Sequence, residues 1–189
     1  YKRHSDLIAR ARSWLDEEAP CGLVSSRTLP SIPLVDLARL RRHLSKVAGQ
    51  PMIMKRHTDS TVASFVERSD FASLADRGPL TPDHVIRTKR VAMVGSTEEA
   101  IDNYAEAYKT YVEENRERIS TEIAEVDPAP RIILDSNVGM LAVGKTIEDS
   151  RIASDIYHHT IPVLCRSEDH LGGYRALAPS DLFDVEYWD

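Results

Sequence analysis

Residues 130–163 read PRIILDSNVGMLAVGKTIEDSRIASDIYHHTIPV, and this stretch decides the fold. Two short apolar runs, 131–135 and 140–143, flank a polar turn, which predicts two strands joined tightly. Thr146 and Asp149 then have the spacing of a reciprocal helix cap, so we expect a helix to begin there. The stretch therefore predicts strand, turn, strand and helix.

The same stretch matches the phosphate-loop pattern. Gly139 to Thr146 (GMLAVGKT) fits GxxxxGK(S/T) letter for letter. In a phosphate loop the residues between the glycines wrap around an anion with their N–H groups turned inward. Met-Leu-Ala-Val is instead typical of a straight, buried strand, and the acidic strand end at Asp135 precedes the pattern where a magnesium-binding one should follow it. A nucleotide-binding loop at Gly139–Thr146 is therefore the weaker alternative, and Lys145–Thr146 is better interpreted as a turn and a helix cap.

Hydrophobic periodicity predicts the elements around this stretch. The expected helices cover 1–18, 34–47 and the region from Ser96 onward, and the expected buried strands cover 51–56 and 91–94. Residues 60–66 are compatible with either a strand or a short helix. Strands interleaved with helices predict an α/β fold.

Composition limits the classes of function. The 189 residues carry a formal charge of -6, which argues against a nucleic-acid partner because such a protein needs a basic face. No apolar run approaches the ~18 residues of a membrane span. The two cysteines, Cys21 and Cys165, lack CxxC spacing, so we expect free thiols and a cytoplasmic location.

One charged cluster is the best candidate for binding chemistry. Asp83, His84, Arg87 and Lys89 follow a predicted helix start at Thr81-Pro82. An imidazole beside two cations could hold a phosphate or a carboxylate, and histidine also transfers protons readily. The alternative is a solvated surface segment with an Asp–Arg pair worth ~0–1 kcal/mol.

Metal and dinucleotide signatures are missing from the sequence. None of the seven histidines forms an HxH or HxxxH pair, and no GxGxxG occurs. A metal site is therefore possible only through convergence of residues far apart in the chain. We expect no cofactor in this chain.

The segment Ser136–Asp149 resembles the N-H-G-(four residues)-G-K-T segment of the class II aldolase/adducin family. The resemblance implies a layered α-β-α fold, a mixed sheet with flanking helices. In that family the strand–turn–strand carries a zinc-ligand histidine, and here Val138 stands in its place. The family's upstream HxH pair is also absent, so the resemblance implies no metal at this position.

Four further segments resemble the middle of the bifunctional rhamnulose-1-phosphate aldolase/alcohol (lactaldehyde) dehydrogenase family. They are Thr81–Lys89, Ala153–Thr160, Tyr174–Leu177 and Leu182–Trp188. The resemblance implies that residues 1–49 are a helical segment like the C-terminal end of a class II aldolase domain. Residues 50–189 would then be an α/β connecting domain, which we interpret as a degenerate aldolase-like half.

The family resemblance also implies an activity for a longer parent protein. That protein would cleave a ketose 1-phosphate and then oxidise or reduce the aldehyde, with zinc and NAD as cofactors. This piece would be structural, joined to flanking aldolase and dehydrogenase domains, and whether it forms a homo-oligomer stays open. The alternative is that Asp83–Lys89 holds the sugar phosphate in the parent's active site. Whether this chain alone is an enzyme also stays open.

Overall fold

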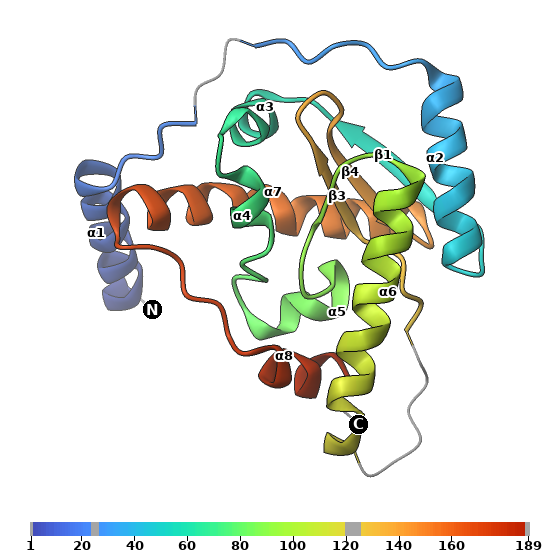
Figure 1. Cartoon of the computed structure of the whole chain (residues 1–189). Helices are drawn as coiled ribbons and strands as arrows, with labels where there is room; N and C mark the ends of the chain where they lie inside the picture. Colours follow the sequence, from blue (N-terminus) through green and yellow to red (C-terminus); the bar gives the residue numbers. More distant parts are fainter. Residues whose placement is uncertain (1, 24–26, 120–125, 188–189) are drawn as a thin grey trace.

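The computed structural model describes residues 2–23, 27–119 and 126–187 (Figure 1). At its centre lies a four-stranded mixed sheet with the order β1-β4-β3-β2. β4 pairs antiparallel with both β1 and β3, and β2 runs parallel to β3. The strands are β1 (Ile53–His57), β2 (Met93–Val94), β3 (Ile132–Asp135) and β4 (Gly139–Gly144).

Helices cover both faces of this sheet, so the predicted α-β-α layering is confirmed (Figure 1). On one face lie α3 (Ser60–Glu67), α4 (Phe71–Ala75) and α7 (Ile147–His170). On the other lie α2 (Leu34–Val47) and α6 (Glu98–Asn115). The remaining helices are α1 (Lys2–Glu18), η1 (Pro82–His84), α5 (Val85–Thr88), η2 (Arg116–Arg118) and α8 (Pro179–Glu186).

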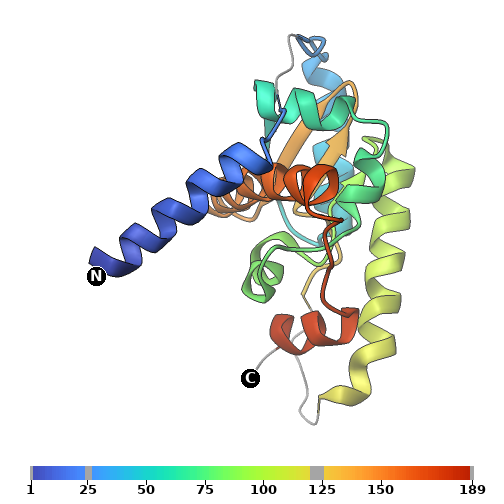
Figure 2. The same cartoon turned by 90° about the vertical axis from the view of Figure 1, so that its left-hand side faces the viewer.

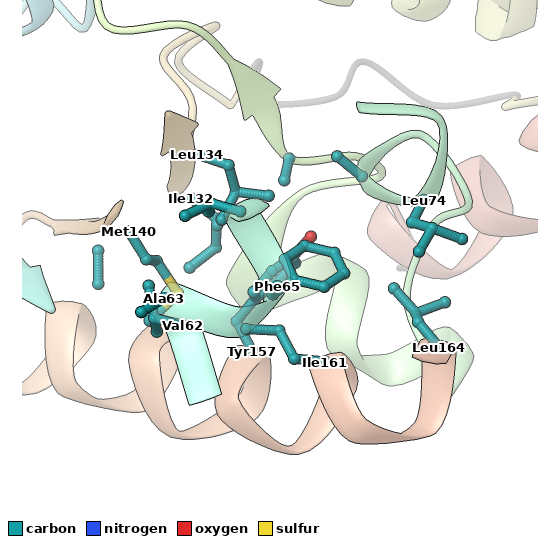
Figure 3. Packing of buried hydrophobic residues seen from close by; sticks show 14 of the residues in the cluster. Val62, Ala63, Phe65, Leu74, Ile132, Leu134, Met140, Tyr157, Ile161 and Leu164 are labelled. Carbon is teal, nitrogen blue, oxygen red and sulfur yellow. The ribbon is translucent and has the colours of Figure 1, made fainter. Parts of the chain in front are cut away.

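The central strands are buried on both faces, which explains why they read as continuous apolar runs. Ile132, Leu134 and Met140 pack with Phe65 of α3 and with α7 (Figure 3). Their neighbours Ile133, Leu141 and Val143 face α2 and α6. Leu40 and Leu44 of α2 join this second cluster, so residues on both sides of the predicted boundary at 49–50 share one core. The boundary itself stays a prediction.

The two glycines of the phosphate-loop pattern are explained by close packing around β4. At Gly139, with φ +89°, a Cβ atom would lie 2.5 Å from the backbone oxygen of His57. At Gly144 a Cβ atom would collide with the backbone N of Ser150 in the first turn of α7. Because all six residues of β4 form a buried strand, the stretch has no wrapped loop that could cradle a phosphate.

The predicted cap of α7 is confirmed. The Thr146 hydroxyl accepts from the N–H of Asp149, and the Asp149 carboxylate accepts from the N–H of Thr146. The open segment 60–66 is a helix, α3, and Asp59 caps it by accepting from Thr61 N–H and Val62 N–H. Val62 and Val66, two of the β-branched residues that favoured a strand there, are instead buried residues of α3.

Helix α1 projects away from the rest of the chain (Figure 2). None of its residues is buried, and Trp14 is 55% exposed. Its end is held by the buried Ala19 and by Arg166, whose Nη2 lies 2.9 Å from Asp16 Oδ1. Among the described residues, no helix has the length and apolar character needed to cross a membrane.

Candidate functional site

The four residues of the predicted cluster do not converge on one position. Asp83 is exposed, and His84 is partly buried. Arg87 lies half-exposed with Nη1 3.5 Å from Asp149 Oδ1. Lys89 is buried and turns toward α8 instead. The sequence therefore placed these residues next to one another in the chain, but the fold sends them to different surroundings.

Lys89 is packed among aromatic and acidic side chains. Its Nζ lies 3.6 Å from the Tyr108 ring centroid and 3.5 Å from Glu186 Oε1. Burial lowers the pKa of Lys89 to about 7, and the charge of Glu186 acts in the opposite direction. Lys89 is also the only non-glycine residue with positive φ, +64°, in the part of the chain that the structure describes. These contacts join the end of α5 to α8 and α6. Because Lys89 is only 3% exposed, a substrate has no access to it.

A different group of side chains does converge. His57, Asp59 and His158 each offer one ligand atom, and these atoms lie within 4.8 Å of one another. His57 ends β1, Asp59 precedes α3, and His158 lies in the middle of α7. The three come together because α3 and α7 pack against the same face of the sheet.

Asp59 divides its carboxylate between two tasks. Oδ1 accepts from the backbone N–H groups of Thr61 and Val62, which caps α3. Oδ2 lies 2.9 Å from Nε2 of His158. The cap fixes the direction of the second oxygen, so the helix start positions a ligand atom toward α7.

The hydrogen bonds of His158 define the chemistry at this point. Its Nδ1 lies 2.8 Å from the backbone oxygen of Ser154, which can only accept a hydrogen bond. Nδ1 therefore carries a proton, and in the neutral ring Nε2 presents a lone pair. The lowered pKa of Asp59 favours its ionised form, and that lone pair would face the ionised Oδ2. The contact with an ionised Asp59 therefore requires either a second proton on His158 or a cation between the two atoms.

His57 completes the group. Its ring meets the His158 ring edge-on, with centroids 5.1 Å apart. Its Nε2 is buried and has no hydrogen-bond partner among the described residues. Burial lowers the pKa of His57, and the neighbouring His158 lowers it further. An imidazole that stays neutral keeps the lone pair that a metal needs.

The acidic member is also suited to a cation. Burial pulls the pKa of Asp59 upward, but hydrogen bonds with His158 and Val62 N–H outweigh it, so the net pKa is lowered. Two imidazoles and one carboxylate are a common ligand set for zinc and other first-row divalent ions. The bond from His158 Nδ1 to a backbone carbonyl is the usual second hydrogen bond of a metal-ligating histidine. The residues present therefore fit a divalent transition metal.

The sequence patterns did not reveal this group, because it contains no histidine pair of the HxH or HxxxH type and its members converge only in the folded chain. His57-Thr58-Asp59 has the one-residue spacing of an HxH pair, with a carboxylate in the second position. His158 lies 99 residues from Asp59, and no local pattern connects them. Val138, which occupies the ligand position implied by the family resemblance, packs in the core on the opposite face.

The four-stranded mixed sheet with helices on both faces is that of a mixed α/β domain of the class II aldolase type. Residues 34–189 match the family described as "Aldolase class II, second domain", and the chain belongs to that family. It is 26% identical over 151 residues to the "Uncharacterized oxidoreductase YuxG" of Bacillus subtilis (strain 168). The match covers 72% of this chain and 21% of that protein, so the chain spans about a fifth of this relative's length. No solved structure matches the chain.

Proposed function

We propose that this chain is the metal-binding second domain of a longer class II aldolase-type protein. His57, Asp59 and His158 would hold one divalent ion, and zinc is the best fit to their donor atoms. The single observation that carries the proposal is His158, whose two ring nitrogens both face oxygen acceptors. A cation between His158 and Asp59 satisfies that geometry without a second proton on the ring.

The chain's own residues would select and orient the ion. Ser154 fixes the His158 ring through its carbonyl oxygen, and the α3 cap fixes Asp59. Partial burial and the neighbouring His158 lower the pKa of His57, which favours its neutral form. A bound zinc ion supplies a Lewis acid that can polarise a carbonyl or hydroxyl oxygen.

The resemblance and the relative support a proposal for the activity of the whole protein. We extend the proposal to a parent that cleaves a sugar 1-phosphate and carries an NAD-linked dehydrogenase unit. The name of the relative as an oxidoreductase, together with its much greater length, supports a second unit of that kind. The free thiols of Cys21 and Cys165 support a cytoplasmic location.

A second candidate function is a connecting domain that binds no metal. In that case His158 carries two protons and forms an ion pair with Asp59. Its two N–H groups then donate to the Ser154 carbonyl oxygen and to Asp59 Oδ2. The domain would then be structural and would support its flanking units.

A zinc titration separates the two candidates. The chain is stripped with a chelator and titrated with Zn²⁺ by calorimetry, and Co²⁺ is used to report the coordination geometry by absorbance. Metal binding predicts one saturable site and a zinc-dependent rise in melting temperature. His57→Ala and His158→Ala should each abolish the site.

His159→Ala is the matched control, because His159 is the exposed neighbour of His158 on the same helix. It should bind zinc like the wild type. Equal zinc binding by the His158→Ala and His159→Ala variants, or no saturable site in the wild type, would leave the connecting-domain function as the better one.

A further inference from the structure

A polar hollow lies at the end of β4 opposite to His57. Its charged lining comes from separate elements: Arg87 from α5, Arg131 just before β3, Lys145 just after β4 and Asp149 from the first turn of α7. Val143 of β4 contributes an apolar wall. The cavity measures about 220 Å³.

Three cations face this hollow, and two of them are only loosely engaged. Arg131 is committed to Asp127, with Nη1–Oδ1 and Nη2–Oδ2 distances of 2.9 and 2.7 Å. Lys145 Nζ comes no closer than 3.9 Å to the same carboxylate, which is longer than a hydrogen bond. Arg87 meets Asp149 only at 3.5 Å. Both loosely paired side chains are about half exposed, so they can turn toward a ligand.

The two carboxylates at this place are already occupied. Asp127 is 7% exposed and accepts both hydrogen bonds from Arg131. Asp149 uses Oδ2 to accept from the N–H and the hydroxyl of Thr146 in the cap of α7. Only the carboxylate of Asp149 therefore remains near Arg87 and Lys145, and one of its oxygens already accepts hydrogen bonds in the α7 cap. The positive charges around the hollow exceed the negative ones.

We propose that this hollow binds a small phosphate-type anion, with Arg87 and Lys145 as its two mobile ligands and Arg131 as a fixed cation beside them. Guanidinium and ammonium groups that converge from different elements are the usual protein ligands of phosphate. The volume is below the ~300–1,000 Å³ of pockets for larger ligands, which favours a single anionic group over a nucleotide.

This anion site is separate from the proposed metal site. His57 pairs with Met140 at one end of β4, and Ile53 pairs with Gly144 at the other. At ~3.3 Å per residue, the four residue steps from Met140 to Gly144 span about 13 Å. The anion would not contact the metal, and its binding does not depend on the proposed metal function.

Titration with inorganic phosphate tests the proposal. The complete chain is titrated by calorimetry in metal-free buffer at low ionic strength. We expect saturable binding that weakens as NaCl is added. The Arg87→Ala/Lys145→Ala double variant should bind phosphate at least tenfold more weakly. Asp149→Asn, which removes the competing charge, should bind it several-fold more tightly.

The matched control is Lys2→Ala/Arg12→Ala, which removes the same net charge from two exposed cations of α1, the helix that projects away from the rest of the chain (Figure 2). It should leave phosphate affinity unchanged.

A titration with glycerol 3-phosphate identifies the kind of ligand. If it binds at least tenfold more tightly than inorganic phosphate, the hollow binds a phosphate ester; if the two bind equally, the hollow binds free phosphate. An equal loss of affinity in the control and test variants, or no saturable binding in the wild type, would overturn the proposal. Zinc titration of the double variant should match the wild type, so failure of this test leaves the metal proposal intact.

Discussion

His158 Nε2 and Asp59 Oδ2 lie 2.9 Å apart although 99 residues separate them in the chain. The same aspartate caps α3, so a single side chain joins the start of one helix to the middle of another. The start of α3 and the position of the Asp59 oxygen that faces His158 therefore depend on the same side chain. Substitutions that preserve one task and remove the other can separate them.

Asp59→Asn and Asp59→Ala form such a pair. Asparagine caps a helix about as well as aspartate, whereas alanine does not, so Asp59→Ala should lower the free energy of unfolding by about 1 kcal/mol relative to Asp59→Asn. Both variants lose the carboxylate ligand, and both should bind zinc at least tenfold more weakly. Urea unfolding of the metal-free proteins and zinc titration measure the two effects. Strong zinc binding by Asp59→Asn would remove the carboxylate from the ligand set.

The lowered pKa of His57 predicts a pH dependence of stability. Because the folded pKa lies below the unfolded value of about 6.5, the unfolded chain binds more protons as pH falls through this range. The contribution of His57 is therefore fully present above pH 6.5 and is lost progressively below it. Urea unfolding at pH 7.5 and 5.5 should show a smaller decrease in His57→Gln than in the wild type. An unchanged decrease would show that His57 is not held neutral.

The lowered pKa of Lys89 predicts a change of stability with pH on the alkaline side. Its folded pKa of about 7 lies well below the unfolded value of 10.5, so between these values the unfolded chain binds more protons. The free energy of unfolding should therefore rise with pH from about 7 to 9, before the thiol of Cys165 begins to act in the reverse direction. Lys89→Met should flatten this rise. The check is denaturant unfolding at pH 7, 8 and 9, and an equal slope in both proteins would contradict the burial argument.

The glycines at the two ends of β4 should tolerate no side chain. Gly139→Ala adds a Cβ against the His57 carbonyl at a positive φ, and Gly144→Ala adds one against the first turn of α7. Each should cost about 2 kcal/mol or more of unfolding free energy. Gly22→Ala is the control, because nothing lies within 4 Å of its Cβ position, and it should change stability by no more than ~0.5 kcal/mol. A tolerated alanine at Gly144 would show that α7 can move away from the strand.

Removal of residues 1–15 should leave the core intact. Helix α1 buries none of its side chains, and the deletion keeps Asp16 and Ala19, which anchor its end. The melting temperature should stay within about 2 °C of the wild type, the equivalent of less than ~1 kcal/mol. A larger drop would mean that the exposed stripe with Trp14 contacts something in solution.

Much of the fold could be predicted because its signals are local. The apolar runs of β3 and β4 and the Thr146–Asp149 cap each lie within a few residues, and each was confirmed. Residues 60–66 were ambiguous because β-branched residues favour a strand, while the Asp59 cap and the buried face of the helix prevail in the structure. Local propensity is a weak guide where tertiary packing decides.

The candidate sites could not be predicted from the sequence, because they are made by the packing of distant elements. Asp83, His84, Arg87 and Lys89 are neighbours in the chain, but the turn from η1 into α5 and the positive φ at Lys89 send them apart. Arg87 lines the same hollow as Arg131 and Lys145 only in the folded protein. His57 and His158 likewise meet only when α7 lies across the sheet.

The packing of β4 has a consequence for genome-wide pattern searches. Both glycines, the apolar residues between them and the capping threonine are each demanded by contacts that have nothing to do with nucleotides. Selection for a stable sheet and helix cap can thus keep every fixed letter of GxxxxGK(S/T) except the lysine as the rest of the sequence drifts. Scans for nucleotide-binding proteins would then return members of this family as false positives, and a test for strand-like residues between the glycines would remove them.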